Sequence, residues 1–271
     1  MLHYAKAQWA TCALLLTSMA FTTAFRTDKD TPGGTYLHKI SSPAGNTMLE
    51  YNPDKTLRKI IQVHQAEDGS TWQDIQLPVY ENGRLVKTLS TDDAKALTGD
   101  LNATFSYASD SHQLQTISYY RNNAVYTQDS LVYNADGKIT ARYHLAVQPA
   151  KREITGYQQY TWDKEGNVAQ MDNYGKQPGQ NRFNLTSTVT YTYDRQQNPQ
   201  QLCQELAYMM DMTPANLSAH NVLSESISTA HSSRTYTHTY TYAYNASKYP
   251  VRGTFRNGMD EGTVKLEWTK L

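Results

Sequence analysis

The sequence predicts an all-β protein whose antiparallel meander forms a large curved sheet or an up-and-down barrel, with one short helical insert. Strand-turn-strand units recur along the chain, and aromatic residues stand near the strand ends. The turns carry pairs such as Asn82-Gly83 and Asp136-Gly137. These pairs favour tight hairpins, because glycine accepts a positive φ and Asn and Asp tolerate one. Short local connections of this kind make neighbouring strands antiparallel.

Aromatic residues mark the repeated units. They fall at positions 51, 80, 107, 133, 162, 193 and 244, with spacings of 29, 27, 26, 29, 31 and 51 residues. A nearly constant spacing indicates a repeated supersecondary unit, here two strands and two turns. A twisted sheet of more than about ten strands tends to curl or close, so we expect a strongly curved or closed body.

Residues 1–24 have the pattern of an export signal. Lys6 gives a weakly positive start, the segment Ala10–Phe21 is apolar, and Ser18-Met19-Ala20 or Thr22-Thr23-Ala24 suits a cleavage site. We therefore expect an exported protein that is periplasmic, displayed on the cell surface or secreted.

A lipid anchor at Cys12 is not expected if the chain starts at Met1, because the apolar run follows this cysteine instead of preceding it. Residues 25–47 are polar and rich in turn formers. They predict a mostly flexible leader, with room for a first strand at Tyr36–Ile40. Residues 48–271 then form a single β domain, because no linker interrupts the repeats.

The long final spacing predicts an insert over residues 199–222. Apolar side chains at Leu206, Met209 and Met210 fit one face of a short helix, which Pro214 would end. We expect this insert to cover an opening or an edge of the sheet.

Thr235–Tyr244 is the most regular strand in the sequence. One face carries threonines and the other carries tyrosines, and both are good surfaces for cross-strand pairing. Aromatic faces can also stack on sugar rings or hold a peptide strand. The candidate ligand-binding residues are therefore Tyr236, Tyr240, Tyr242 and Tyr244. The competing interpretation is that these rings are simply the packed face of the sheet.

The repeated Tyr-x-x-Asp-Gly-x-Ile units resemble the YD-type repeats of bacterial surface proteins. Most of residues 48–255 is also similar to a family of exported Bacteroidetes proteins, a domain of unknown function with a porin-like fold. The residues that carry this second resemblance are Tyr191–Asp194, Asn198-Pro199, Leu202–Met212, Leu217–Val222 and Tyr240–Asn245. The resemblance implies a porin-like fold and export, and it implies no activity and no site residues. Many members of this family look like lipoproteins. The residues around Cys12 depart from the lipoprotein pattern.

Composition and spacing point to no catalytic, metal or cofactor site. Lys plus Arg and Asp plus Glu both number 25, so zero formal charge gives no reason to expect nucleic acid or an anionic membrane as partner.

No histidine pair has the helical spacing of a zinc hydrolase, and Asp163–Asn167 lacks the distal glutamate of a calcium loop. A Gly-x-Ser-x-Gly motif is absent. Cys203 is expected to be a small buried hydrophobe. We expect no cofactor and no metal.

Three functions follow from these observations as alternatives. The first is an exported, non-enzymatic β scaffold that binds a glycan, a peptide or an envelope protein through its aromatic face or its insert. The second is a secreted hydrolase or lyase whose site assembles from separate loops. The third is an outer-membrane barrel, but Thr235–Tyr244 lacks a lipid-facing apolar row, so we do not expect membrane insertion.

Overall fold

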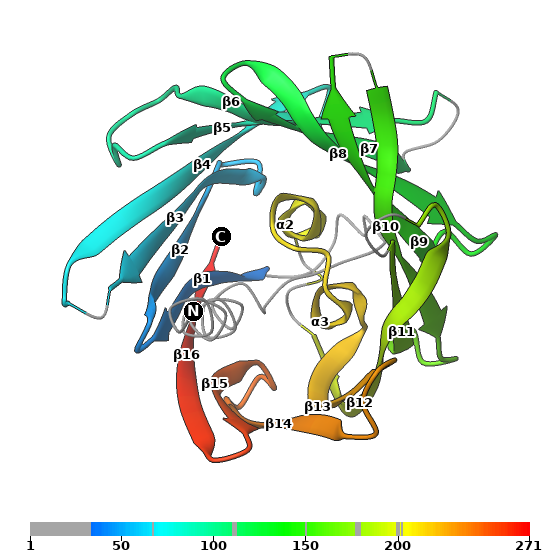
Figure 1. Cartoon of the computed structure of the whole chain (residues 1–271). Helices are drawn as coiled ribbons and strands as arrows, with labels where there is room; N and C mark the ends of the chain where they lie inside the picture. The colour runs from blue at the N-terminus through cyan, green and yellow to red at the C-terminus, as the bar shows by residue number, and fades with distance from the viewer. Residues whose placement is uncertain are drawn as a thin grey trace.

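The computed structural model of the protein describes residues 34–66, 68–109, 113–149, 151–176, 180–198, 201 and 203–271. The predicted export signal, residues 1–24, and the first part of the predicted leader lie outside these ranges. The described chain forms a closed antiparallel barrel (Figure 1). This confirms the predicted all-β meander and selects the barrel over the open curved sheet.

Sixteen strands follow one another around the barrel in chain order, and β1 pairs with β16 to close it. The first eight are β1 (Thr35–Ser42), β2 (Gly45–Tyr51), β3 (Leu57–Gln65), β4 (Thr71–Glu81), β5 (Arg84–Thr91), β6 (Asp100–Tyr107), β7 (Leu114–Arg121) and β8 (Ala124–Tyr133). The second eight are β9 (Ile139–Gln148), β10 (Lys151–Trp162), β11 (Val168–Lys176), β12 (Phe183–Gln197), β13 (His220–Thr229), β14 (Thr235–Tyr244), β15 (Pro250–Asn257) and β16 (Asp260–Lys270).

Successive connections alternate between the two ends of the barrel, because each strand is antiparallel to the next. We call the end that holds the β12–β13 connection the insert end, and the other the far end. The predicted turns at Asn82-Gly83 and Asp136-Gly137 both lie at the insert end. Gly83 and Gly137 each have a φ of 75°, which is the conformation that selects glycine there.

Residues 34–47, part of the predicted leader 25–47, belong to the barrel, so the barrel starts before the expected boundary, and the first strand expected at Tyr36–Ile40 falls within β1. Thr35–Ser42 forms β1, and Ile40 pairs with Leu266 of β16. Leu37 and Ile40 are each only 3% exposed, so their burial inside the barrel explains why this polar-looking segment is ordered.

The predicted helical insert lies inside the barrel and forms two short helices (Figure 1). These are α2 (Gln204–Met209) and α3 (Pro214–Leu217). Leu206, Met212 and Leu217 are at most 3% exposed, and they pack in the same clusters as the inward side chains of the wall. Cys203 is buried beside them, as its expected role as a small hydrophobe requires.

Aromatic residues close the hairpins at the insert end. In each of six hairpins, the aromatic residue near the end of the second strand donates a hydrogen bond to a backbone carbonyl near the start of the first. These clasps are Tyr51–Leu37, Tyr107–Leu85, Tyr133–Leu114, Trp162–Ile139, Tyr193–Val168 and Trp268–Pro250. Five of the seven repeated aromatic positions, all except Tyr80 and Tyr244, therefore tie strand ends together where no turn joins them.

The outer face of β12–β14 is covered with hydroxyl side chains. Ser226 and Thr237 lie opposite each other with their hydroxyls 3.3 Å apart, and Ser228 and Thr235 repeat the arrangement at 3.2 Å. The threonine face of β14 thus points to solvent, and its tyrosine face points into the barrel.

Candidate functional site

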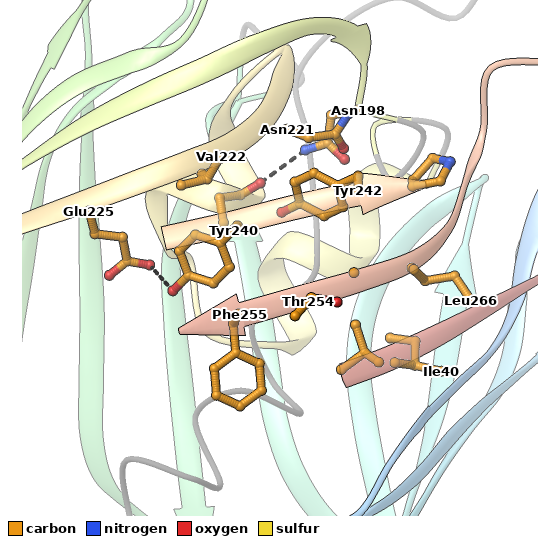
Figure 2. A pocket seen from close by; sticks show the side chains of 14 residues that line it. Ile40, Asn198, Asn221, Val222, Glu225, Tyr240, Tyr242, Thr254, Phe255 and Leu266 are labelled. Atoms are coloured by element: carbon orange, nitrogen blue, oxygen red, sulfur yellow. Dashed lines mark hydrogen bonds between the residues drawn. The ribbon is translucent and has the colours of Figure 1, made fainter. Parts of the chain in front are cut away.

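A cavity of about 70 Å³ lies inside the barrel, between the insert and the wall formed by β13–β16 and β1 (Figure 2). We call it the tyrosine cavity, because Tyr240 and Tyr242 line it. The strand register explains the lining. Tyr240 pairs with Phe255 and Tyr242 pairs with Gly253, so Tyr240, Tyr242 and Phe255 share the inner face of the sheet.

The wall of the tyrosine cavity is mostly apolar. Ile40 and Leu266 are paired across β1 and β16, and Val222 of β13 stands on another side. Ile40, Val222 and Leu266 are each at most 6% exposed. From the insert side, Asn198 and Ala215 complete the lining. An apolar cavity with a few placed polar groups is the usual form of a small-molecule site.

Glu225 and Tyr240 are the polar pair of the cavity. The Tyr240 hydroxyl donates a hydrogen bond of 2.7 Å to Glu225 Oε1 (Figure 2). His238 Nδ1 lies 3.9 Å from Glu225 Oε2. Burial raises the pKa of Glu225, although Tyr240 and His238 both act to lower it. A buried carboxyl group with a raised pKa can share a hydrogen bond with an uncharged group of a ligand. A second negative charge beside it would be unfavourable.

Hydrogen bonds beside the cavity fix the start of β13 and the insert. Asn221 Nδ2 donates to Asp194 Oδ2 at 3.1 Å, and the Tyr244 hydroxyl also donates to this carboxylate. The side chain of Asn198 donates to the backbone carbonyl of Ala215 at 2.9 Å. These bonds hold one wall of the cavity in place, and none of them involves the carboxyl group of Glu225.

The structure separates the four tyrosines proposed from the sequence. Tyr240 and Tyr242 reach the cavity, whereas Tyr244 is bonded to Asp194. Tyr236 shares the inner face by register but is 52% exposed near the far end. Sequence reasoning missed Glu225, whose signal was a lone acid at an inward position of the serine-rich segment Ser224–Ser228.

A second polar cluster connects the insert to the opposite wall. Arg142 donates from Nε and Nη2 to Asp129 Oδ2, at 3.0 and 2.8 Å, and from Nη1 to Asp211 of the insert at 2.8 Å. His144 Nδ1 lies 2.7 Å from Asp129 Oδ1, and the Tyr119 hydroxyl donates to Oδ2 at 2.9 Å. Burial alone would raise the pKa of Asp129, but His144 and Arg142 outweigh it and lower that pKa.

No three His, Cys, Asp or Glu side chains gather into a possible metal site among the described residues. No helix in the described part of the chain is long and apolar enough to cross a membrane.

No family model and no curated protein sequence matches the chain. The fold is similar to a porin-like protein from Bacteroides uniformis ATCC 8492, with a TM-score of 0.57 and 12% identity over 88% of this chain and 98% of that one. A porin-like protein from Bacteroides vulgatus ATCC 8482 aligns with a TM-score of 0.42 and 13% identity over 88% of this chain and 100% of that one. The first likeness supports the predicted porin-like fold. Membership of the exported Bacteroidetes family and the YD-type repeats stay predictions.

Proposed function

We propose that the protein is an exported, non-enzymatic β-barrel scaffold that binds a small neutral ligand in the tyrosine cavity. The ligand has an apolar or aromatic body and one uncharged hydrogen-bonding group, as a phenol has. The observation that carries this proposal is the buried Glu225–Tyr240 pair set into an otherwise apolar wall. The space of about 70 Å³ is about half the roughly 150 Å³ of an apolar cavity that holds benzene, so a ring-sized group enters only as the lining side chains move apart.

The sequence and the outer surface both support an exported location. The pattern of residues 1–24 favours export. Hydroxyl side chains cover the outer face of β12–β14, and Arg256 and Glu261 form an ion pair of 2.6 Å on the outer face of β15–β16. A membrane-spanning barrel instead presents an apolar band to lipid. These features favour a barrel that works in water over one inserted in the outer membrane.

The hydrolase alternative rests on the coupled pair His144–Asp129 inside the barrel. Asp129 also accepts two hydrogen bonds from Arg142, which in turn donates to Asp211 of the insert. This arrangement suits an ion-pair anchor for the insert better than an orienting group for a catalytic histidine. The pair therefore favours a scaffold role.

Binding of two shape-matched probes tests the proposal. We expect p-cresol to bind the purified mature chain at pH 8 at least ten times more tightly than 4-methylbenzoate, measured by calorimetry. The reason is that the carboxylate would have to be buried beside Glu225. Glu225→Gln should reduce the ratio between the affinities for p-cresol and 4-methylbenzoate, whereas Glu261→Gln on the outer face should leave that ratio unchanged. Equal binding of both probes, or binding of neither, would contradict the proposal.

A further inference from the structure

A second and larger cavity opens inside the barrel toward its far end. Its volume is about 670 Å³, and we call it the vestibule. Its polar lining residues include Gln62, Asp74, Gln76, Ser90, Asp100 and Asn102. Gln62 pairs with Asp74, and Ser90 pairs with both Gln76 and Asp100, so these side chains share the inner face.

The vestibule continues toward the insert. Gln62 and Gln76 also line an adjoining hollow of about 350 Å³ that reaches Tyr119, Arg142 and Asp211. The floor of the space is therefore the polar cluster that joins the insert to the wall. The tyrosine cavity has a separate lining and shares no residue with the vestibule.

The lining offers hydrogen-bond donors and acceptors side by side. The side chains of Gln62, Gln76 and Asn102 present both an amide donor and a carbonyl acceptor, and Asp74 and Asp100 present acceptors. The Oε1 atom of Gln76 is buried and has no partner within the described residues. A buried acceptor without a partner costs free energy unless a ligand or water satisfies it.

An exposed aromatic ring, Trp72, lies two residues from the lining residue Asp74 on the inner face of β4, although it does not itself line the vestibule. Trp72 pairs with His64 on the inner face, and the two rings stack at 5.1 Å with an interplanar angle of 16°. Trp72 is 46% exposed although it stacks on His64, and His64 Nε2 lies 3.1 Å from Asp74 Oδ2. An indole face beside amides and carboxylates provides stacking for an apolar ring face and hydrogen bonds for hydroxyl groups.

We propose that the vestibule binds a neutral oligosaccharide, with Trp72 against a sugar face and the amides and carboxylates on its hydroxyl groups. Asp74, Asp92 and Asp100 line the space and disfavour an anionic glycan. Arg142, at the floor, is already bonded to two carboxylates and cannot offset them. The volume of about 670 Å³ is in the range of sites that take ligands larger than one ring.

A panel of defined tetrasaccharides tests this inference with the mature chain. The neutral probes are maltotetraose, cellotetraose, xylotetraose and mannotetraose, and the anionic probe is tetragalacturonate. We expect at least one neutral probe to bind and to change the tryptophan fluorescence, and the anionic probe to bind at least ten times more weakly. Trp72→Ala and Asp100→Asn should each weaken the neutral probe at least tenfold.

Two control variants make the result specific to the vestibule. Asp136→Asn, in the exposed β8–β9 turn at the insert end, should bind the neutral probe as the parent chain does. Val222→Phe, which fills the tyrosine cavity, should also bind the neutral probe as the parent chain does. A failure of oligosaccharide binding in the vestibule is therefore distinguishable from a failure of the function proposed for the tyrosine cavity. The inference is overturned if no neutral probe binds, if Trp72→Ala and Asp100→Asn bind unchanged, or if calcium chloride alone stabilises the chain.

Discussion

The Tyr133 hydroxyl donates a hydrogen bond of 2.6 Å to the backbone carbonyl of Leu114, and so joins the two ends of the β7–β8 hairpin that no turn connects. The same clasp occurs in five further hairpins. Leu114 is fully buried, so its carbonyl has no access to water if the clasp is lost. This contact explains why an aromatic residue recurs at a fixed place in the repeat.

Tyr133→Phe should therefore lower the free energy of unfolding by about 1 kcal/mol, because it removes the hydrogen bond and leaves a buried carbonyl unsatisfied. Tyr80→Phe is the matched control. Tyr80 occupies the same place opposite Leu57, but its buried hydroxyl does not reach hydrogen-bonding geometry. Urea unfolding should show a loss for the first variant and no loss for the second; equal losses would mean that ring packing, and not the clasp, is what matters.

Arg142 anchors the insert to the barrel wall, so its removal should be far more harmful than removal of its exposed partner. Arg142→Met leaves the 2% exposed Asp129 without its main counter-charge and should cost about 3–5 kcal/mol. Asp211→Asn affects a side chain that is 46% exposed and should cost less than about 1 kcal/mol. Chemical denaturation measures both. If the two variants were equally unstable, the buried Asp129 would not depend on Arg142 for its counter-charge.

The lowered pKa of Asp129 predicts a loss of stability in acid. The folded group titrates below its ordinary value of 3.8, so its contribution is complete above about pH 5 and disappears as the pH falls through the folded pKa. The stability difference between the parent chain and Asp129→Asn should stay constant from about pH 7 to pH 5 and shrink below about pH 4. A difference that is independent of pH in urea unfolding would show that Asp129 is not ionised in the folded barrel.

Glu225 should behave in the opposite way. Its folded pKa lies above the ordinary value of 4.5, so the folded state is favoured while the carboxyl is protonated and loses stability as the pH rises through the folded pKa. As the pH rises from about 4 to about 8, the parent chain should lose stability relative to Glu225→Gln. Thermal unfolding of both proteins across this range measures the trend, and a trend of the opposite sign would place Glu225 beside an unrecognised positive charge.

Local patterns predicted the parts of the fold that depend on local contacts. Asp136-Gly137 and the alternating Leu131–Tyr133 identify a hairpin because turn conformation and side-chain alternation are properties of neighbouring residues. Barrel closure depends on Ile40 meeting Leu266, a contact between the two ends of the barrel. No local pattern specifies that pairing, so the sequence leaves room for a strand at Tyr36–Ile40 but does not predict that it belongs to the barrel.

The site was predictable only in part, for a similar reason. The alternation in Thr235–Tyr244 identified an aromatic face but not whether it points inward or outward. That choice depends on which face meets the insert, and the insert was expected to cover an edge or an opening and instead lies inside the barrel. Glu225 gains its raised pKa only from burial against β14, so a single acid among serines carried no clear signal in the sequence.

Binding of p-cresol to the tyrosine cavity is the most direct test of the account. Val222 is 4% exposed and lines this cavity, whereas Val132 is 44% exposed on the outer face of β8. Calorimetric titration of the parent chain, Val222→Phe and Val132→Phe, each first shown to unfold cooperatively, should give binding to the parent and to Val132→Phe and at least a tenfold loss for Val222→Phe. Undiminished binding to Val222→Phe would show that the ligand does not occupy the barrel interior between β14 and the insert.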